Sequence, residues 1–240
     1  MNQYQFQAPR LSPVNKVIVI TTAALFILQA ILKAVGAFSL VPVLGLSGAG
    51  VSSGLLYQFV TYPFVEVQLM SALFNCLLVW FIGSELESMW GRKVYLRFLL
   101  LTVVGVGIFY TLVSFIFFHG THVYESPLFG LNGINFALLI AYATCYPDRQ
   151  LSLMMIFPMR AQTFCWVLAG IEAYMALFSN ITTSWAHLLA MGLSWLIIRF
   201  QRTSFLSKVL NHSFERKKSS KKGHLYVVKD DDQKPPKYWQ

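Results

Sequence analysis

The sequence predicts an all-α membrane protein with six transmembrane helices. The chain has 240 residues, of which 56% are hydrophobic and only 12% charged, and its mean hydropathy is +0.56. A soluble domain needs more charge on its surface than this. The apolar residues form six stretches close to the roughly 17 to 25 residues that a hydrocarbon core about 30 Å thick requires. These stretches cover residues 14–35, 67–83, 95–118, 129–145, 162–178 and 185–200.

Each stretch is expected to be a helix, because backbone groups in lipid must find their hydrogen-bond partners within the segment. Residues 36–66, between the first two helices, contain no Lys or Arg and are rich in Gly and apolar side chains. We expect them to form short helices at the membrane interface. Residues 1–13 are an N-terminal cytoplasmic segment and residues 14–202 the membrane domain. Residues 203–240 have too little apolar content for a core and are expected to be a disordered cytoplasmic tail.

The basic residues are distributed unevenly along the chain, whose net charge is +9. Of 19 Lys and Arg residues, 18 lie near the two termini or in the connections between the second and third and between the fourth and fifth helices, and only Lys33 lies near the opposite face. The positive-inside rule then predicts that both termini are cytoplasmic, and we expect a protein of the bacterial cytoplasmic membrane. No folded basic module remains for nucleic acid. The tail carries a cluster that could bind anionic lipid, namely Arg216, Lys217, Lys218, Lys221 and Lys222.

Two short motifs carry the functional prediction. Gly130-Leu131-Asn132-Gly133 opens the fourth stretch, and Ala186-His187 lies in the sixth. With Ser in place of Asn132, this would be the Ser–His dyad of rhomboid intramembrane proteases, a family that the chain resembles over residues 57–202. The resemblance implies a rhomboid-like six-helix bundle. A histidine can activate a hydroxyl for attack, but a carboxamide exposes no nucleophilic atom, so the chain is predicted to be an inactive relative of these endopeptidases.

Small residues recur every four positions on the fourth and sixth helices, and such seams let membrane helices pack closely. This packing is expected to bring Asn132 near His187. The resemblance implies that Phe136, one turn after Asn132, stacks on the histidine ring. It also implies that Gly130, Gly133 and Phe136 line a cavity. We expect substitution of Gly133 by Leu to break the seam.

The second helix supplies the remaining positions of the site by resemblance. Rhomboid proteases have an outer histidine, and a second histidine and an asparagine that hold the oxyanion. In this sequence the outer position is Glu66, and the two oxyanion positions are Ser71 and Asn75. A serine side chain is too short to replace an imidazole, so this part of the site also looks degenerate.

Structural interpretations stand beside these functional ones. His187 could be hydrogen-bonded to Asn132 or to water, and Asn75 could bond between helices. Glu172 is costly in lipid and has no partner four residues away, so we expect it to face the bundle, hydrogen-bonded, rather than to relay protons. The spacing of His119, His122 and Glu125 resembles a metal site, but no fourth ligand is in view. No metal or cofactor is expected.

The sequence therefore predicts a rhomboid-like pseudoprotease that binds transmembrane segments of client proteins without cleaving them. The binding route would run between the second and fifth helices, over Phe136 and Asn132. One alternative is an active rhomboid-type endopeptidase with a non-standard catalytic group. Another is transport through a polar cavity lined by Asn132, Ser71, Asn75 and His187.

Overall fold

The computed structural model describes residues 11–36, 38–118, 120–147, 150–153, 157–178 and 183–200. The chain divides into two units, Met1–Arg199 and Phe200–Gln240, and the fold below is that of the first unit. Residues 1–10 and the predicted tail at 203–240, with its five-residue basic cluster, lie outside the described residues.

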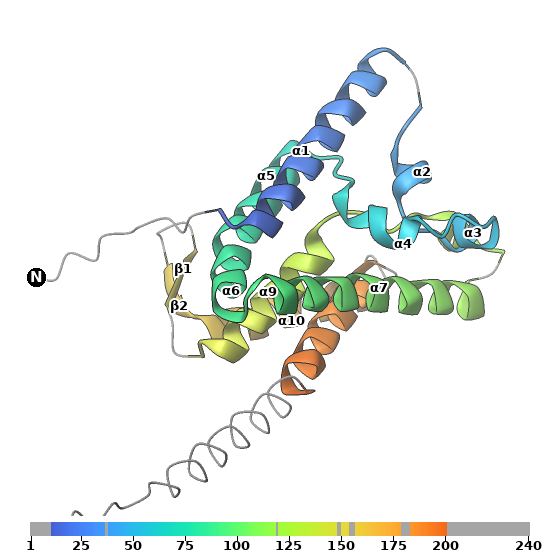
Figure 1. Cartoon of the computed structure of the whole chain (residues 1–240). Coiled ribbons are helices and arrows are strands. Elements are labelled where there is room, and N and C mark those ends of the chain that lie inside the picture. The colour runs from blue at the N-terminus through green and yellow to red at the C-terminus, as the bar shows by residue number, and fades with distance from the viewer. Residues whose placement is uncertain are drawn as a thin grey trace, which may run out of the picture. The chain divides into compact units, whose positions relative to one another are not determined.

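The described part of the chain is nearly all helical, which agrees with an all-α membrane protein (Figure 1). Four of its helices are long and apolar enough to cross a membrane. A fifth, α9 (Asn132–Cys145), is apolar but shorter, and residues 183–200 are also helical. Six spans therefore remain a prediction. The four long helices are α1 (Pro13–Ala34), the continuous helix Leu69–Trp90, α7 (Arg92–Phe117) and α10 (Ala161–Phe178).

The second long helix extends seven residues past its predicted end. It consists of α5 (Leu69–Leu78), the π-helical segment η2 (Val79–Gly83) and α6 (Ser84–Trp90). The sequence of α6 is polar, but its Ser84 and Glu87 are buried and hydrogen-bonded to the start of α1. The helix ends at Gly91, whose φ of +79° suits glycine.

The connection between α1 and α5 contains the expected short helices, α2 (Val41–Leu44), α3 (Gly48–Ser52), α4 (Gln58–Thr61) and the 3₁₀ turn η1 (Tyr62–Phe64). A β-bridge joins Leu46 to Leu128, just after the short helix α8 (His122–Glu125). The α3 and α4 helices pack against α7. This packing is close at Gly107, where a Cβ atom would lie 2.8 Å from the Phe59 ring.

A short hairpin between α9 and α10 was not predicted by the sequence. Its strands are β1 (Gln150–Leu153) and β2 (Phe157–Arg160), which pair antiparallel with Gln150 opposite Arg160. The hairpin packs against the beginning of α10.

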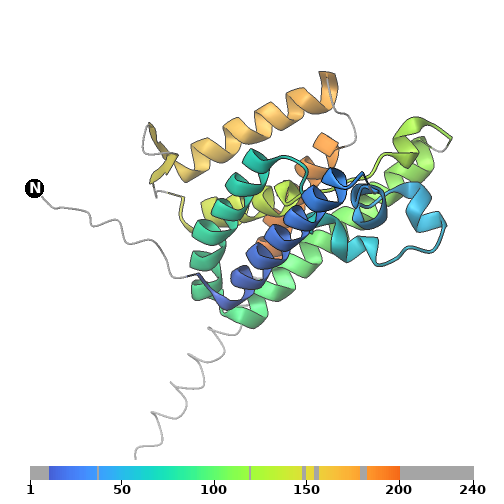
Figure 2. The ribbon, with the colours of Figure 1, turned by 90° about the horizontal axis from the view of Figure 1, so that it is seen from above.

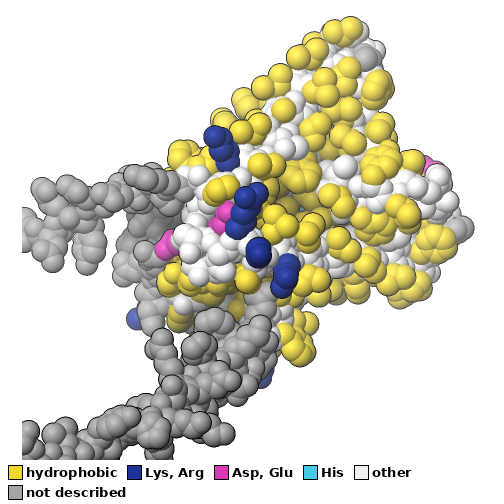
Figure 3. All heavy atoms as spheres, viewed as in Figure 1, with side chains coloured by type: hydrophobic (Ala, Val, Ile, Leu, Met, Phe, Trp, Pro, Cys, Tyr) yellow, Lys and Arg dark blue, Asp and Glu magenta, His cyan; other side chains and the backbone are white. Residues whose placement is uncertain are grey.

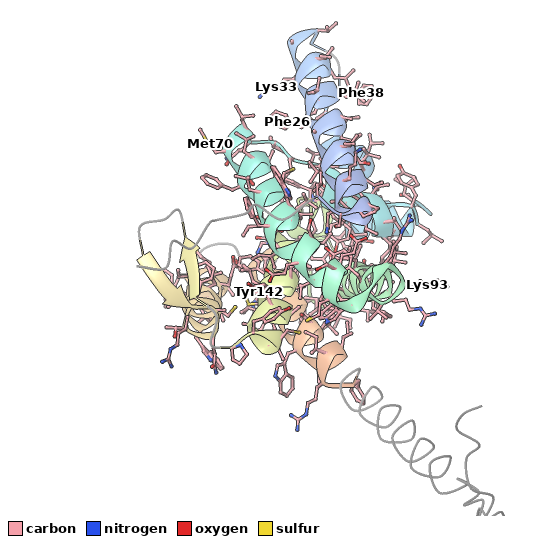
Figure 4. The ribbon with its side chains drawn as sticks, turned by 60° about the vertical axis from the view of Figure 1, so that its left-hand side comes forward. Phe26, Lys33, Phe38, Met70, Lys93 and Tyr142 are labelled. Atoms are coloured by element: carbon pink, nitrogen blue, oxygen red, sulfur yellow. The ribbon has the colours of Figure 1, made fainter. Side chains whose placement is uncertain are left out.

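The core of the unit is built around α9. This helix packs against α5, η2, α7 and α10, and Figure 2 shows it among them. Its Ala137 and Leu138 and the Phe98 side chain of α7 are almost completely buried. Lys33 lies in the last turn of α1, near the top of Figure 4, and Lys93 at the start of α7 lies well below it in that view.

Candidate functional site: a buried polar centre at the start of α9

The loop before α9 is fixed against the segment between α4 and α5. Gly130 has a φ of +98°, which glycine adopts without steric cost. Its backbone N–H donates to the carbonyl oxygen of Tyr62 at 3.1 Å. The Tyr62 hydroxyl donates in turn to the Val103 carbonyl at 3.1 Å, and burial raises its pKa, so it stays protonated as a donor. The first residues of α9 are thereby held beside η1 and α5.

The centre of the site is the carboxylate of Glu66, whose side chain is buried. Its Oε1 atom accepts from the backbone N–H of Leu131 at 3.0 Å and from Asn75 Nδ2 at 2.7 Å. Its Oε2 atom accepts from the Ser71 hydroxyl at 3.1 Å. Asn75 Nδ2 also lies 3.2 Å from Ser71 Oγ. The three positions predicted on the second helix are thus brought together, with the Glu66 carboxylate at their centre.

Asn135 completes this network, although it is not among the site residues predicted from the sequence. Its Nδ2 atom donates to Asn75 Oδ1 at 2.8 Å, while its own Oδ1 is buried without a partner among the described residues. A polar residue three positions after Asn132 lies on nearly the same face of the helix. An amide in an otherwise apolar membrane helix is itself a signal of an interhelical contact. That signal was available in the sequence.

Asn132 is the first residue of α9, at the position expected for a nucleophile. Within the described part of the chain, its carboxamide makes no hydrogen bond, and the expected bond to His187 does not form. The two residues are linked indirectly, through Phe136 one turn further along α9. The Phe136 and His187 rings lie with their centroids 5.1 Å apart and their planes tilted by 44°. The predicted contact between these two rings is therefore present.

His187 has a different partner from the one predicted. Its Nδ1 atom lies 3.3 Å from Glu172 Oε2, and both side chains are largely buried, at 13% and 15% exposure. Glu172 lies on α10, whereas His187 lies on the helix at 183–200. Spacing along one helix does not predict this pair, because it joins two helices. Glu172 faces the bundle and has a polar partner, as expected.

The predicted seam between α9 and the helix at 183–200 forms. Ala137 and Ala190 are fully buried, and the Ser194 hydroxyl donates to the Ala137 carbonyl at 2.7 Å. The expectation for Gly133 is wrong, however. A Cβ atom at Gly133 would have no described atom within 4 Å, so this position borders open space and does not form the tight contact.

The candidate metal ligands remain apart from this site. His122 and Glu125 are the two ends of α8, near the outer end of α7. His119 lies outside the described residues.

The sequence matches the family described as Eukaryotic integral membrane protein (DUF1751) over residues 16–220. This family is part of the rhomboid-like superfamily, which agrees with the resemblance drawn from the motifs. No curated protein matches the chain. The expectation of a bacterial cytoplasmic membrane is wrong, because the matched family is eukaryotic.

Proposed function

The chain belongs to the DUF1751 family of eukaryotic integral membrane proteins, and from this premise we propose that it binds transmembrane segments of client membrane proteins without cleaving them. The proposal has two parts, the absence of proteolysis and the presence of a binding route. Separate observations support each part.

The position of Glu66 is the observation that carries the first part. Acyl transfer requires hydrogen-bond donors aimed at the place where negative charge develops, and losing one such donor costs about 10² to 10³ in rate. Here Asn75 Nδ2 and the Leu131 N–H already donate to the Glu66 carboxylate. The Glu66 carboxylate would repel a second negative charge that approached these donors. Asn132 offers no nucleophile for attack on the peptide carbonyl, and Glu66 occupies the donors that would stabilise the resulting oxyanion. Both steps of peptide cleavage are thus opposed.

The second part rests on the helices that flank the start of α9. The α5 and α10 helices both pack on α9, and each carries large apolar side chains on its surface. Leu73 of α5 is 51% exposed and Trp166 of α10 is 73% exposed. Open space borders Gly133, which lies in the first turn of α9, three residues before Phe136. A client helix that entered between α5 and α10 would meet this space.

One observation favours the alternative of an active endopeptidase. A histidine that is oriented by a carboxylate, as His187 is by Glu172, has the arrangement of a general base. A base also needs a nucleophile to deprotonate. Among the described residues, no hydroxyl or thiol makes a hydrogen bond to His187. The inactive assignment is therefore the better supported one.

Photocrosslinking in membranes tests the binding route. The photoreactive residue p-benzoylphenylalanine replaces Leu73 or Trp166, and Ile27 on α1 serves as an equally exposed apolar control. Mass spectrometry then identifies the adducts. We expect peptide adducts of other membrane proteins at positions 73 and 166, and fewer of them at position 27.

A blocking variant makes this test specific. Gly133→Leu would fill the open space beside Asn132, whereas Gly192→Leu would fill comparable open space elsewhere. We expect Gly133→Leu to reduce protein adducts several-fold and Gly192→Leu to leave them unchanged. Lipid adducts alone, or equal effects of the two variants, would contradict client binding.

A further inference from the structure

An apolar groove lies between α1 and α7, beside η1. Its volume is about 250 Å³. Apolar residues of both helices line it, together with Val60 of α4 and Pro63 and Phe64 of η1. The one charged residue in the lining is Arg92, the first residue of α7. We call this feature the α1–α7 groove.

The groove reaches into the protein. Ile134 of α9, which is only 5% exposed, forms part of its lining, as do the buried side chains of Val14, Ile18 and Val103. A groove with a buried floor differs from the shallow surface of a single lipid-facing helix. It can exclude bulk lipid on several sides and hold one chain in place.

Its size decides between possible occupants. A helix with its side chains is about 10 Å across, and a segment as long as the groove would occupy on the order of 1,000 Å³. This is several times the volume of the groove, so a whole helix could lie against the groove but could not enter it. A single unbranched hydrocarbon chain is much thinner.

The length of the groove matches one leaflet of a bilayer. Its lining residues on α7 run from Arg92 to Val103, which covers about 16 Å of helix axis. Half of a hydrocarbon core is about 15 Å thick. Arg92 is the first residue of α7 and Val103 lies near the middle of this helix, so a groove of this length would run from one membrane surface to about the middle of the bilayer. A lipid has this same division, with a polar headgroup and an apolar chain.

Charge determines which headgroup fits. Among the described residues, Arg92 makes no ion pair with a carboxylate, and it lies exposed on the surface. Lys16, Lys93 and Arg97 are also exposed, in the first two turns of α1 and α7. Figure 3 shows Lys and Arg side chains gathered beside apolar surface at one end of the unit. A guanidinium group binds a phosphate through paired hydrogen bonds.

We propose that the α1–α7 groove binds one acyl chain of an anionic phospholipid, with Arg92 contacting the headgroup phosphate. This site is separate from the tail cluster at residues 216–222 and from the client route. It would give the protein a preference for membranes that carry anionic lipid in the leaflet at its basic end. The proposal does not depend on the proposed client binding.

The test uses the full chain in vesicles, with p-benzoylphenylalanine in place of Leu96, a residue that lines the groove. The vesicles contain dioleoyl phosphatidylserine or dioleoyl phosphatidylcholine, which differ in headgroup but share their acyl chains. We expect more crosslinking to phosphatidylserine. The variant Arg92→Gln should lower that crosslinking roughly five-fold, because one basic residue near an anionic membrane surface contributes about 1 kcal/mol of binding free energy. Arg92→Lys should retain most of it.

A matched variant separates a defined site from a diffuse basic surface. Lys93→Gln removes the same charge from the neighbouring residue, which does not line the groove, and should leave crosslinking nearly unchanged. Leu100→Trp should fill the groove and lower crosslinking to both lipids. Equal effects of Arg92→Gln and Lys93→Gln, or equal crosslinking to the two lipids, would overturn the proposal. Size-exclusion chromatography confirms that each variant is folded.

Discussion

At the scale of single residues, one carboxylate determines the chemistry of the polar centre. Glu66 is buried and accepts hydrogen bonds from a backbone N–H, an amide and a hydroxyl. Such bonds to a charged acceptor are stronger than those between neutral groups. The donors that would otherwise be available to a reaction intermediate are thus held by the protein itself. Replacing Asn132 would restore a nucleophile but would not release these donors.

This leads to a prediction about partial restoration of reactivity. Asn132→Ser alone should not react with a fluorophosphonate probe above the level of Asn132→Ala, because Glu66 still holds Asn75 and the Leu131 N–H. Adding Glu66→Gln removes the negative charge and should raise labelling at position 132. In-gel fluorescence of purified protein measures the difference. Full labelling of the single variant would show that Glu66 does not control the site.

At the scale of elements, the junction between α1, η2 and α7 depends on a small residue. Gly83 ends the π-helical segment, and a Cβ atom there would lie 2.6 Å from Tyr95 Oη and 2.8 Å from Asn15 Oδ1. These two atoms are hydrogen-bonded to each other at 2.7 Å, and both side chains are fully buried. Neither can move without breaking that bond. The close approach of the three helices therefore requires glycine.

Two Gly→Ala variants test this requirement against a matched control. In a helix, alanine is favoured over glycine by about 1 kcal/mol where space permits. Gly133→Ala, which would meet no described atom, should keep or raise the thermal unfolding temperature. Gly83→Ala should lower it by several degrees, because overpacking typically costs about 1 to 3 kcal/mol. Tryptophan fluorescence during heating in detergent measures both. Equal unfolding temperatures would refute the close contact at Gly83.

At the scale of the whole unit, α1 is held mainly at one end. Of its 22 residues, only Val14, Asn15, Ile18, Thr22 and Gln29 are buried, and the first three lie in its first two turns. Its start is fixed by Glu87 of α6, which accepts from the Ser12 hydroxyl at 2.5 Å, the Val14 N–H at 3.4 Å and Asn15 Nδ2 at 3.4 Å. The carboxylate also lies at the positive end of the α1 dipole. This attachment positions one wall of the α1–α7 groove.

Loss of the Glu87 carboxylate should therefore destabilise the packing of α1 and leave the packing of the other helices unchanged. Glu87→Ala leaves the donors at the start of α1 without their acceptor, at a cost of about 1 to 3 kcal/mol for each buried group. Hydrogen–deuterium exchange should become faster in peptides from α1 than in peptides from α9. Glu87→Gln keeps an acceptor oxygen and should show a smaller effect. A uniform increase along the chain would mean that Glu87 supports the whole fold.

The sequence by itself determined the features that depend on local composition. Runs of apolar residues located the helices to within a few residues, because lipid leaves the backbone no other hydrogen-bonding solution. The motif around Asn132 identified the chain's resemblance to rhomboid proteases, and that resemblance implied the contact between the Phe136 and His187 rings. The end of the second long helix was predicted too early, because the sequence of α6 is polar. The helix continues through α6 because its buried Glu87 has hydrogen-bond partners at the start of α1.

Only the tertiary structure decided which polar groups meet. Glu66 and Leu131 lie 65 positions apart in the chain, and Glu172 and His187 lie on different helices. Such pairs depend on how helices rotate and shift against one another, and the spacing of residues within one helix carries no information on this. The same holds for Gly133, which borders open space, and for Gly83, which does not. Both are small residues in apolar helices, and only the position of the neighbouring helix distinguishes them.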